Sequence, residues 1–234
     1  MTRSASPFEI PLGVGSYTAP EAARLLRTPV RNIRRWMLGY SYGPADKRRS
    51  SPPLWQSQLS MIEDQLEVGF RDLIELRFVT AFVEQGVGLL TIRNCLEFAR
   101  SIVHDTHPFS TRRFRTDGKT IFLESTRDSV EPELLDLKRR QLVFQRVFER
   151  SFRDLEIEAD AVVRWRPFNG KASIVIDPRR SFGQPIAAAS GVPTIALAQA
   201  VKSEGSVSRV AQLYEVAPLV VRDAVRFEES LLAA

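Results

Sequence analysis

Residues 17–40 read YTAPEAARLLRTPVRNIRRWMLGY, and this stretch predicts two short helices joined by a tight turn. Thr18 is a suitable N-cap for the first helix, and Glu21 stands three residues later, where it completes a capping box. The turn reads RTP, and Thr28 is expected to cap a second helix that has Pro29 at its first position. The chain is therefore expected to begin with a helix-turn-helix.

The second helix separates an apolar stripe from a basic face. Val30, Ile33 and Met37 recur at helical spacing with Trp36 beside them, so they are expected to be buried. No acid occurs between Val30 and Tyr40, and such self-repulsion is tolerable when phosphates supply the counter-charge. Arginine and asparagine also suit base edges in a major groove. A DNA-binding face is predicted, with an ordinary solvated basic face as the alternative; its residues are Thr28, Arg31, Asn32, Arg34 and Arg35.

The excess positive charge lies near the N-terminus. Residues 1–60 hold nine Lys or Arg against three Asp or Glu, a net of +6, whereas the whole chain carries +5. Residues 41–55, SYGPADKRRSSPPLW, hold three prolines and are expected to form a loop or wing. An anionic partner is therefore sought first at this end, and Lys47, Arg48 and Arg49 are expected to contact the DNA backbone.

The rest of the chain mixes helical and strand patterns. Apolar spacing predicts helices within residues 70–86, 89–103 and 131–152. Asp117-Gly118 and Asn169-Gly170, each flanked by alternating residues, predict two β-hairpins and hence a small antiparallel sheet. An extended loop is expected over residues 178–194, followed by three helices over roughly 193–203, 206–213 and 217–232.

No catalytic or metal-binding constellation is visible. His104 and His107 are the only histidines, and two ligands three residues apart do not close a metal site. The chain has no P-loop, no G-x-G-x-x-G and no G-x-S-x-G. It also lacks an apolar run long enough to span a membrane and the apolar core of a signal peptide. We expect a cytoplasmic protein without a cofactor or membrane partner that is not an enzyme.

The quoted N-terminal stretch resembles the MerR-type helix-turn-helix. That family opens with an aromatic residue and threonine, continues with an alanine-rich helix and ends its recognition helix in a pattern like RRW. DKRRSSPPLW stands where the family has a wing that ends in an aromatic residue. The resemblance implies a winged helix-turn-helix that binds double-stranded operator DNA.

The last sixty residues resemble a small helix-turn-helix domain found in antitoxins of the VapB type. Ala189-Ser190-Gly191 departs from that pattern, which usually has an arginine-glycine-threonine turn here. The resemblance implies a type II toxin–antitoxin module whose partner is a PIN-like ribonuclease. The matching positions are Asp177-Pro178, Gly183, Pro185, Gly191, Pro193-Thr194, Gly205-Ser206, Tyr214 and Ala224.

The last helix is apolar over most of its circumference, and such a helix is buried on more than one side. We therefore expect a homodimer, with Val221, Ala224, Phe227 and Leu231 at the subunit contact. By the resemblance, a toxin is neutralised by arginine inserted among its carboxylates or by blocked access of RNA. Arg179 and Arg180 are the favoured toxin-binding residues, and the alternatives are solvated loop charges or the group Arg112, Arg113 and Arg115.

The expected fold is mainly α with a small antiparallel β region. Its parts are a winged helix-turn-helix in residues 1–60, a central helical region with hairpins in 61–172, and a three-helix antitoxin-type domain in 173–234. The expected function is that of a DNA-binding antitoxin that represses its own operon and neutralises a PIN-like toxin. The alternative is a stand-alone MerR-like transcription regulator whose central region senses a ligand.

Overall fold

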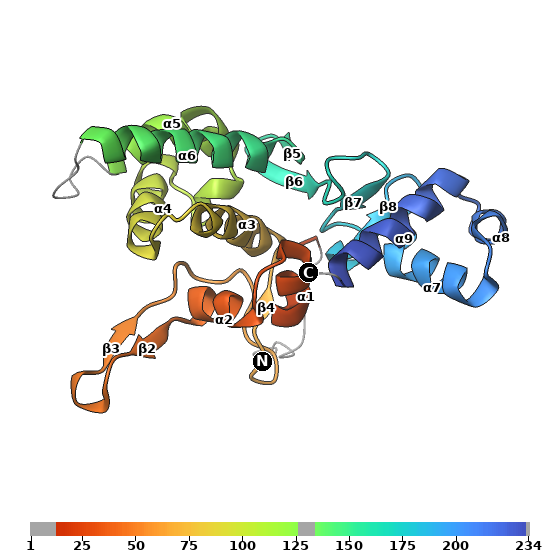
Figure 1. Ribbon diagram of the computed structural model, residues 1–234, viewed down its shortest axis with the longest axis horizontal. Coiled ribbons are helices and arrows are strands. Elements are labelled where there is room, and N and C mark those ends of the chain that lie inside the picture. Colours follow the sequence, from red (N-terminus) through yellow and green to blue (C-terminus); the bar gives the residue numbers. More distant parts are fainter. Residues whose placement is uncertain (1–12, 126–133, 233–234) are drawn as a thin grey trace, which may run out of the picture.

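The computed structural model describes residues 13–125 and 134–232, which form a mainly helical protein with small antiparallel sheets (Figure 1). The expected fold class is confirmed. The helices are α1 (Ala19–Leu26), α2 (Val30–Leu38), α3 (Phe70–Glu84), α4 (Leu89–Val103), α5 (Arg112–Ser125), α6 (Leu134–Phe152), α7 (Thr194–Glu204), α8 (Val207–Leu213) and α9 (Pro218–Leu232). The strands are β1 (Tyr17–Thr18), β2 (Tyr40–Tyr42), β3 (Arg49–Ser51), β4 (Glu67–Val68), β5 (Leu155–Glu158), β6 (Ala161–Trp165), β7 (Ile174–Ile176) and β8 (Pro185–Ala187).

The expected helix-turn-helix is α1 and α2. The capping box is present, because Thr18 N donates to Glu21 Oε2 at 2.8 Å and Thr18 Oγ1 accepts from Glu21 N at 3.4 Å. Thr28 was wrongly expected to cap α2. Pro29 has an extended ψ of 137°, so the helix starts at Val30 and has no side-chain cap. Thr28 Oγ1 instead accepts from the Asn32 side chain at 3.4 Å.

A two-stranded wing follows α2, where β2 pairs antiparallel with β3. Gly39 allows this hairpin to leave the helix: its φ is +75°, and a Cβ there would lie 2.5 Å from the carbonyl oxygen of Ser51. Two arginines of α4 hold the segment that follows β3 at the base of the wing, with Arg93 donating to the carbonyl of Pro52 at 2.8 Å and Arg100 to that of Leu54 at 2.6 Å. The wing is therefore anchored at its base.

Aromatic rings from α3, α5 and α6 fill the central core. The Phe82 and Phe144 ring centroids lie 5.3 Å apart, and those of Phe122 and Phe144 lie 4.1 Å apart. This packing overturns the hairpin expected at Asp117-Gly118, because that dipeptide lies inside helix α5. A Cβ on Gly118 would lie 2.4 Å from the Phe148 ring, so glycine here permits close approach of two helices and makes no turn.

The four-stranded sheet has the order β5-β6-β7-β8, with every neighbouring pair antiparallel. The second expected hairpin is confirmed as β6–β7, whose connection holds Asn169 at φ +52° and Gly170 at φ +74°. Two strands were not anticipated. Ala159, at φ +48°, makes the β5–β6 turn without a glycine, and β8 forms within the expected loop because Ile186 pairs with Val175 and is fully buried.

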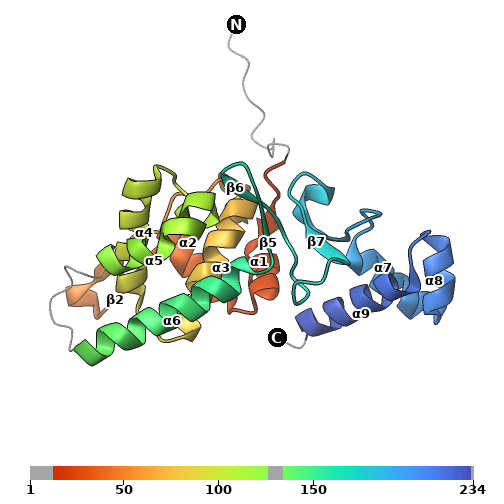
Figure 2. The ribbon, with the colours of Figure 1, turned by 90° about the horizontal axis from the view of Figure 1, so that it is seen from above.

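The three expected C-terminal helices are confirmed as α7, α8 and α9. They enclose a small core of their own, which includes Leu197, Val210 and Val221. Phe227 and Leu231, at the end of α9, belong instead to the larger core that α1 to α6 share. In Figures 1 and 2, α9 accordingly runs from the C-terminal unit toward α1.

A buried carboxylate joins the wing to the central helices. Asp72 Oδ1 lies 2.8 Å from both Trp55 Nε1 and His107 Nε2, and Asp72 Oδ2 accepts from the Gly69 amide at 3.0 Å. His107 therefore takes part in a structural network. In the described ranges, no three His, Cys, Asp or Glu residues gather as a metal site would require. None of the helices described there has the length and apolarity to cross a bilayer.

Candidate nucleic-acid interface

Helix α2 presents its arginines to solvent because its other face is buried. Ile33, Trp36 and Met37 are at most 4% exposed and pack into the main core. Their spacing of three and four residues leaves the intervening positions on the outer face. The side chains that remain exposed on that outer face are Arg31, Arg34 and Arg35, together with Leu38 at the end of the helix, which is 45% exposed.

The positive charge of this face is uncompensated. Within residues 13–125 and 134–232, no ion pair involves Arg31, Arg34 or Arg35. The Arg35 guanidinium lies 3.9 Å from the centroid of the Tyr40 ring, a cation–π contact that orients the group and keeps its charge. Asn32 is half-buried and its side chain is held by Thr28, so it is less available than the arginines.

The wing adds three cations beside α2. Lys47 ends a short 3-10 turn, η1 (Ala45–Lys47), and Arg49 begins β3, with Arg48 between them. All three side chains are exposed, and none pairs with a carboxylate of the described residues. The hairpin extends directly from α2 in Figure 1. The structure thus places both groups of sequence-predicted DNA contacts on adjoining elements.

The two arginines expected to bind a toxin differ from each other in their surroundings. Arg179 is 52% exposed and lies 3.1 Å from Glu158, itself an exposed carboxylate. Arg180 is half-buried and donates to the carbonyl of Ala188 at 2.8 Å. Its guanidinium also covers Gly191, where a Cβ would lie 2.6 Å from Arg180 Nη2. Arg179 is the more accessible of the two, whereas Arg180 fixes its own loop.

The residues expected at a subunit contact are buried within one chain. Val221 and Ala224 are fully buried in the small core, and Phe227 and Leu231 are 2% and 5% exposed in the large one. These four side chains are therefore covered by the chain's own helices, whereas Leu219 and Leu232 of the same helix stay exposed, at 60% and 80%. The apolar pattern of α9 could not show that Phe227 and Leu231 pack into the larger core of the same chain.

Sequence reasoning missed a cluster of three arginines at the end of α6, called the α6 arginines below: two lie on the helix, and Arg153 directly follows its last residue, Phe152. Arg146, Arg150 and Arg153 are exposed and line a cavity of about 600 Å³ together with residues of α1, α3 and α9. The spacing of Arg146 and Arg150 is a sequence signal, because residues four apart lie on one face of a helix. That α1 and α9 face the same cavity could not be read from the sequence.

The chain is similar to proteins of Mycobacterium tuberculosis. It is 27% identical over 230 residues to a protein named "Putative antitoxin VapB45", and the match covers 93% of this chain and 94% of that protein. It also resembles the crystal structure of Rv2018, with a TM-score of 0.72 and 26% identity over 93% of this chain and 99% of that one. No protein-family model matches the chain.

Proposed function

We propose that this protein is a DNA-binding antitoxin that represses its own operon and neutralises a PIN-like ribonuclease. The observation that carries the DNA-binding part is the row of exposed, unpaired arginines on α2 beside the basic wing. The likeness to a protein named as an antitoxin, which extends over nearly the whole of both chains, supports the antitoxin part.

The two groups of cations are suited to different parts of a duplex. A helix that lies in a major groove brings its arginines to base edges, where each bidentate contact to guanine discriminates between bases. The wing residues lie on a short hairpin next to that helix, and lysine or arginine there neutralises phosphates without reading sequence. We therefore assign Arg31, Arg34 and Arg35 to base contacts, and Lys47, Arg48 and Arg49 to phosphate contacts.

A mobility-shift titration of the full chain with the DNA upstream of its own gene tests this assignment. We expect a dissociation constant of about 10⁻⁸ M or lower at physiological salt and much weaker binding to unrelated DNA. Equal affinity for both DNAs at every salt concentration would mean that α2 is an ordinary basic surface that does not read the base sequence. Absence of binding to either DNA would contradict the proposal.

For the toxin contact we propose the loop that contains Arg179 and Arg180, with Arg179 as the side chain that reaches the partner. Its pairing with Glu158 is solvent-exposed, and such pairs contribute little. Its second carboxylate contact, with the buried Asp177, is long at 3.9 Å, so Arg179 can exchange partners. Arginine suits a cluster of carboxylates because its donors pair with them bidentately. Arg180 supports this role by holding the loop through the Ala188 carbonyl.

Co-expression with the protein encoded beside this gene tests the toxin contact. Arg179→Ala should release toxicity with no loss of thermal stability, whereas Arg180→Ala should also lower the melting temperature. Full protection by both variants would exclude this loop. A pull-down from the native host that yields no nuclease would contradict the antitoxin role itself.

We also propose a homodimer that binds two half-sites, since helix-turn-helix proteins commonly pair in this way. The contact would lie outside the buried residues of α9. We also propose a division near residues 60 and 172, with residues 173–234, which include the Arg179 loop and α7 to α9, as the partner-binding unit. A light-scattering mass near the 26.5 kDa of one chain would contradict the dimer.

A stand-alone regulator that senses a ligand is the second candidate. The observation that favours it is the arginine-lined cavity, because its walls include α1 of the helix-turn-helix as well as central helices. Absence of any protein partner in the pull-down, together with DNA affinity that depends on a small molecule, would favour this alternative.

A further inference from the structure

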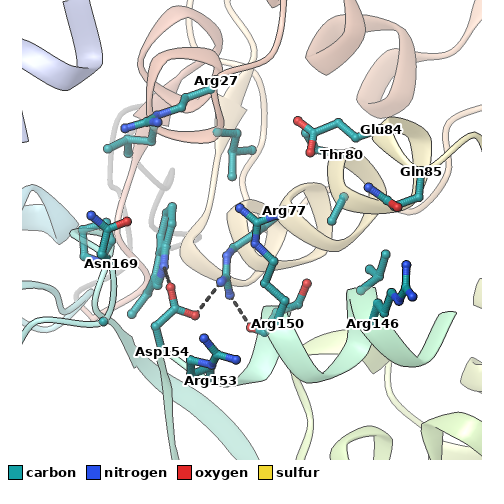
Figure 3. A pocket seen from close by; sticks show the side chains of 18 of the residues that line it. Arg27, Arg77, Thr80, Glu84, Gln85, Arg146, Arg150, Arg153, Asp154 and Asn169 are labelled. Atoms are coloured by element: carbon teal, nitrogen blue, oxygen red, sulfur yellow. Dashed lines mark hydrogen bonds and ion pairs between the residues drawn. The ribbon is translucent and has the colours of Figure 1, made fainter. Parts of the chain in front are cut away.

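The cavity that contains the α6 arginines lies where three parts of the fold meet. Its walls come from α1, α3, α6, the β6–β7 connection and the end of α9, and its volume is about 600 Å³. That volume falls within the range of small-molecule sites in proteins. Figure 3 shows Arg27, the residue that follows α1, across the cavity from Arg146 and Arg153, with Arg77 of α3 between them.

The charges that line the cavity do not cancel. Five arginines face two carboxylates there, Glu84 and Asp154, a net of +3. Arg77 and Asp154 neutralise each other through an ion pair in which both side chains are mostly buried. The remaining charges are Glu84 and four arginines, which are Arg27, Arg146, Arg150 and Arg153. Within the described residues, none of these four arginines forms an ion pair.

The positive potential reaches the buried part of the site. Burial lowers the pKa of Arg77, Asp154 raises it, and the nearby charge of Arg150 lowers it again. Arg77 also donates to the Ser151 carbonyl, and its guanidinium lies 5.1 Å from the Trp165 ring. Arg77 is thus fixed in place, while the arginines around it keep their charge for a ligand.

A second observation concerns Thr80, which lines the same cavity. Its side chain is 6% exposed, and its hydroxyl has no hydrogen-bond partner among the described residues. Buried polar atoms are nearly always satisfied, so an unpartnered hydroxyl at the wall of a cavity indicates a missing donor or acceptor. Because the Thr80 Oγ1 atom is itself buried, an anionic oxygen in the cavity would accept its hydrogen bond after a rotation of the Thr80 side chain, whereas the exposed guanidinium donors are reached directly.

We propose that this cavity binds a small, multiply charged oxyanion, held by Arg27, Arg146, Arg150 and Arg153 and by the Thr80 hydroxyl. Charges of two to four on the ligand match the net charge of the lining. Phosphate and carboxylate oxygens fit guanidinium groups equally well in geometry. Because the walls include both α1 and α9, an occupied cavity would tie the N-terminal unit to the C-terminal helix.

Calorimetric titration of the full chain, without DNA, tests the proposal with pyrophosphate, citrate and ADP as probes. We expect saturable binding of at least one probe at a single site, and a melting temperature that rises with its concentration. Pyrophosphate and ADP bind without citrate if the ligand is a phosphate compound, and citrate binds without them if it is a polycarboxylate.

Variants locate the binding. Arg146→Gln with Arg150→Gln should weaken it at least tenfold, whereas Arg113→Gln with Arg115→Gln removes the same charge from exposed sites on α5 and should have little effect. Thr80→Val should weaken binding without lowering the melting temperature, because the hydroxyl has no partner to lose.

Three results would overturn the proposal. One is the absence of saturable binding of all three probes at millimolar concentration. Another is an equal loss of binding in both arginine pairs, which would indicate general attraction to a basic surface. The last is binding only of DNA or of an acidic peptide, which would make these arginines part of a macromolecular surface.

Discussion

The N-terminal pair α1–α2 and the C-terminal helices α7–α9 are built by the same local rules but leave different surfaces free. Each unit has a helix that ends in a left-handed residue, Arg27 in one and Gly205 in the other. Each also has a helix with a hydroxyl N-cap, Thr18 or Ser206. Local chemistry alone therefore does not distinguish them.

The difference lies in the charges that surround their arginines, because α2 carries no acid, whereas the exposed Arg222 and Arg226 share α9 with Asp223, Glu228 and Glu229. In the C-terminal unit the buried Asp223 binds Lys171 at 2.8 Å, and the exposed Arg209 pairs with Glu204 at 2.9 Å. On α2, by contrast, the three arginines of the outer face have no carboxylate within reach among the described residues. A helix-turn-helix pattern predicts how helices pack, whereas the unpaired charges indicate what the unit can bind.

The largest expected effect is on stability, at Phe227 of α9. Phe227→Ala leaves a cavity in the main core and should lower the free energy of unfolding by about 3–5 kcal/mol, measured by urea denaturation. Leu219→Ala is the matched control, since Leu219 lies on the same helix at 60% exposure and should change stability by less than about 0.5 kcal/mol. If the Phe227→Ala variant kept its stability but had a lower molecular mass in solution, Phe227 would lie at a subunit interface instead.

Replacing Arg31, Arg34 and Arg35 together by alanine should weaken operator binding at least about a hundredfold, since each base contact contributes about 1–3 kcal/mol. The melting temperature should hold, because these side chains lie outside the core. The control is a triple alanine variant in the C-terminal unit, at the exposed Arg209, Arg222 and Arg226. If a mobility-shift assay showed the same loss of DNA affinity for both triple variants, the proposed difference between the two units would be wrong.

A comparison of two glycines can separate the cost of backbone strain from the cost of a steric clash. Gly39 and Gly205 both have positive φ, but only at Gly39 would a Cβ meet another atom, at 2.5 Å from the Ser51 carbonyl. Gly205→Ala should cost about 1 kcal/mol, and Gly39→Ala more, up to about 3 kcal/mol, with a loss of DNA affinity as the wing shifts. Equal costs in thermal unfolding, with unchanged DNA binding, would show that the wing tolerates displacement.

Asp223 gives the C-terminal unit a pH dependence. Burial alone raises its pKa, but hydrogen bonds from Lys171 and Ser173 hold the pKa below the usual value of 3.8. Its stabilising contribution is therefore complete above that value and is lost as the pH falls through the lowered pKa. Asp223→Asn should cost about 1–2 kcal/mol at pH 7, since Lys171 is partly solvated, and less at pH 3. A constant difference in unfolding free energy between pH 7 and pH 3 would contradict this.

The wing should show the smallest effect, best seen in the salt dependence of DNA binding. Replacing Lys47, Arg48 or Arg49 singly by glutamine should flatten the logarithmic salt slope by about one unit for each phosphate that is no longer neutralised. Affinity should fall to a similar extent on all sequences. A change in sequence preference at an unchanged salt slope would mean that the wing reads bases.

The sequence predicted best those features that depend on neighbours along the chain. The capping box at Thr18, the buried stripe of α2 and the three C-terminal helices depend on residues within one or two turns. The hairpin expected at Asp117-Gly118 was wrong because a glycine in a helix and a glycine in a turn look alike until Phe148 is known to lie against it. Strand β8 was missed for a related reason, because residues 185–187 become a strand only by pairing with β7.

The candidate DNA face follows from residues 28–35 and 47–49 alone, because exposure on a helix is set by the side that is apolar. What the sequence could not give is which distant segments share a surface. Tyr17 donates to the Gly183 carbonyl at 2.8 Å, and α9 closes onto α1, contacts that link residues more than 160 positions apart. Only the tertiary structure decided that the α9 core residues are buried within one chain, and that Arg27 and the α6 arginines line one cavity. The burial of a side chain and the net charge of a cavity depend on every helix and strand that surrounds them. A sequence pattern describes only the helix or strand in which it occurs.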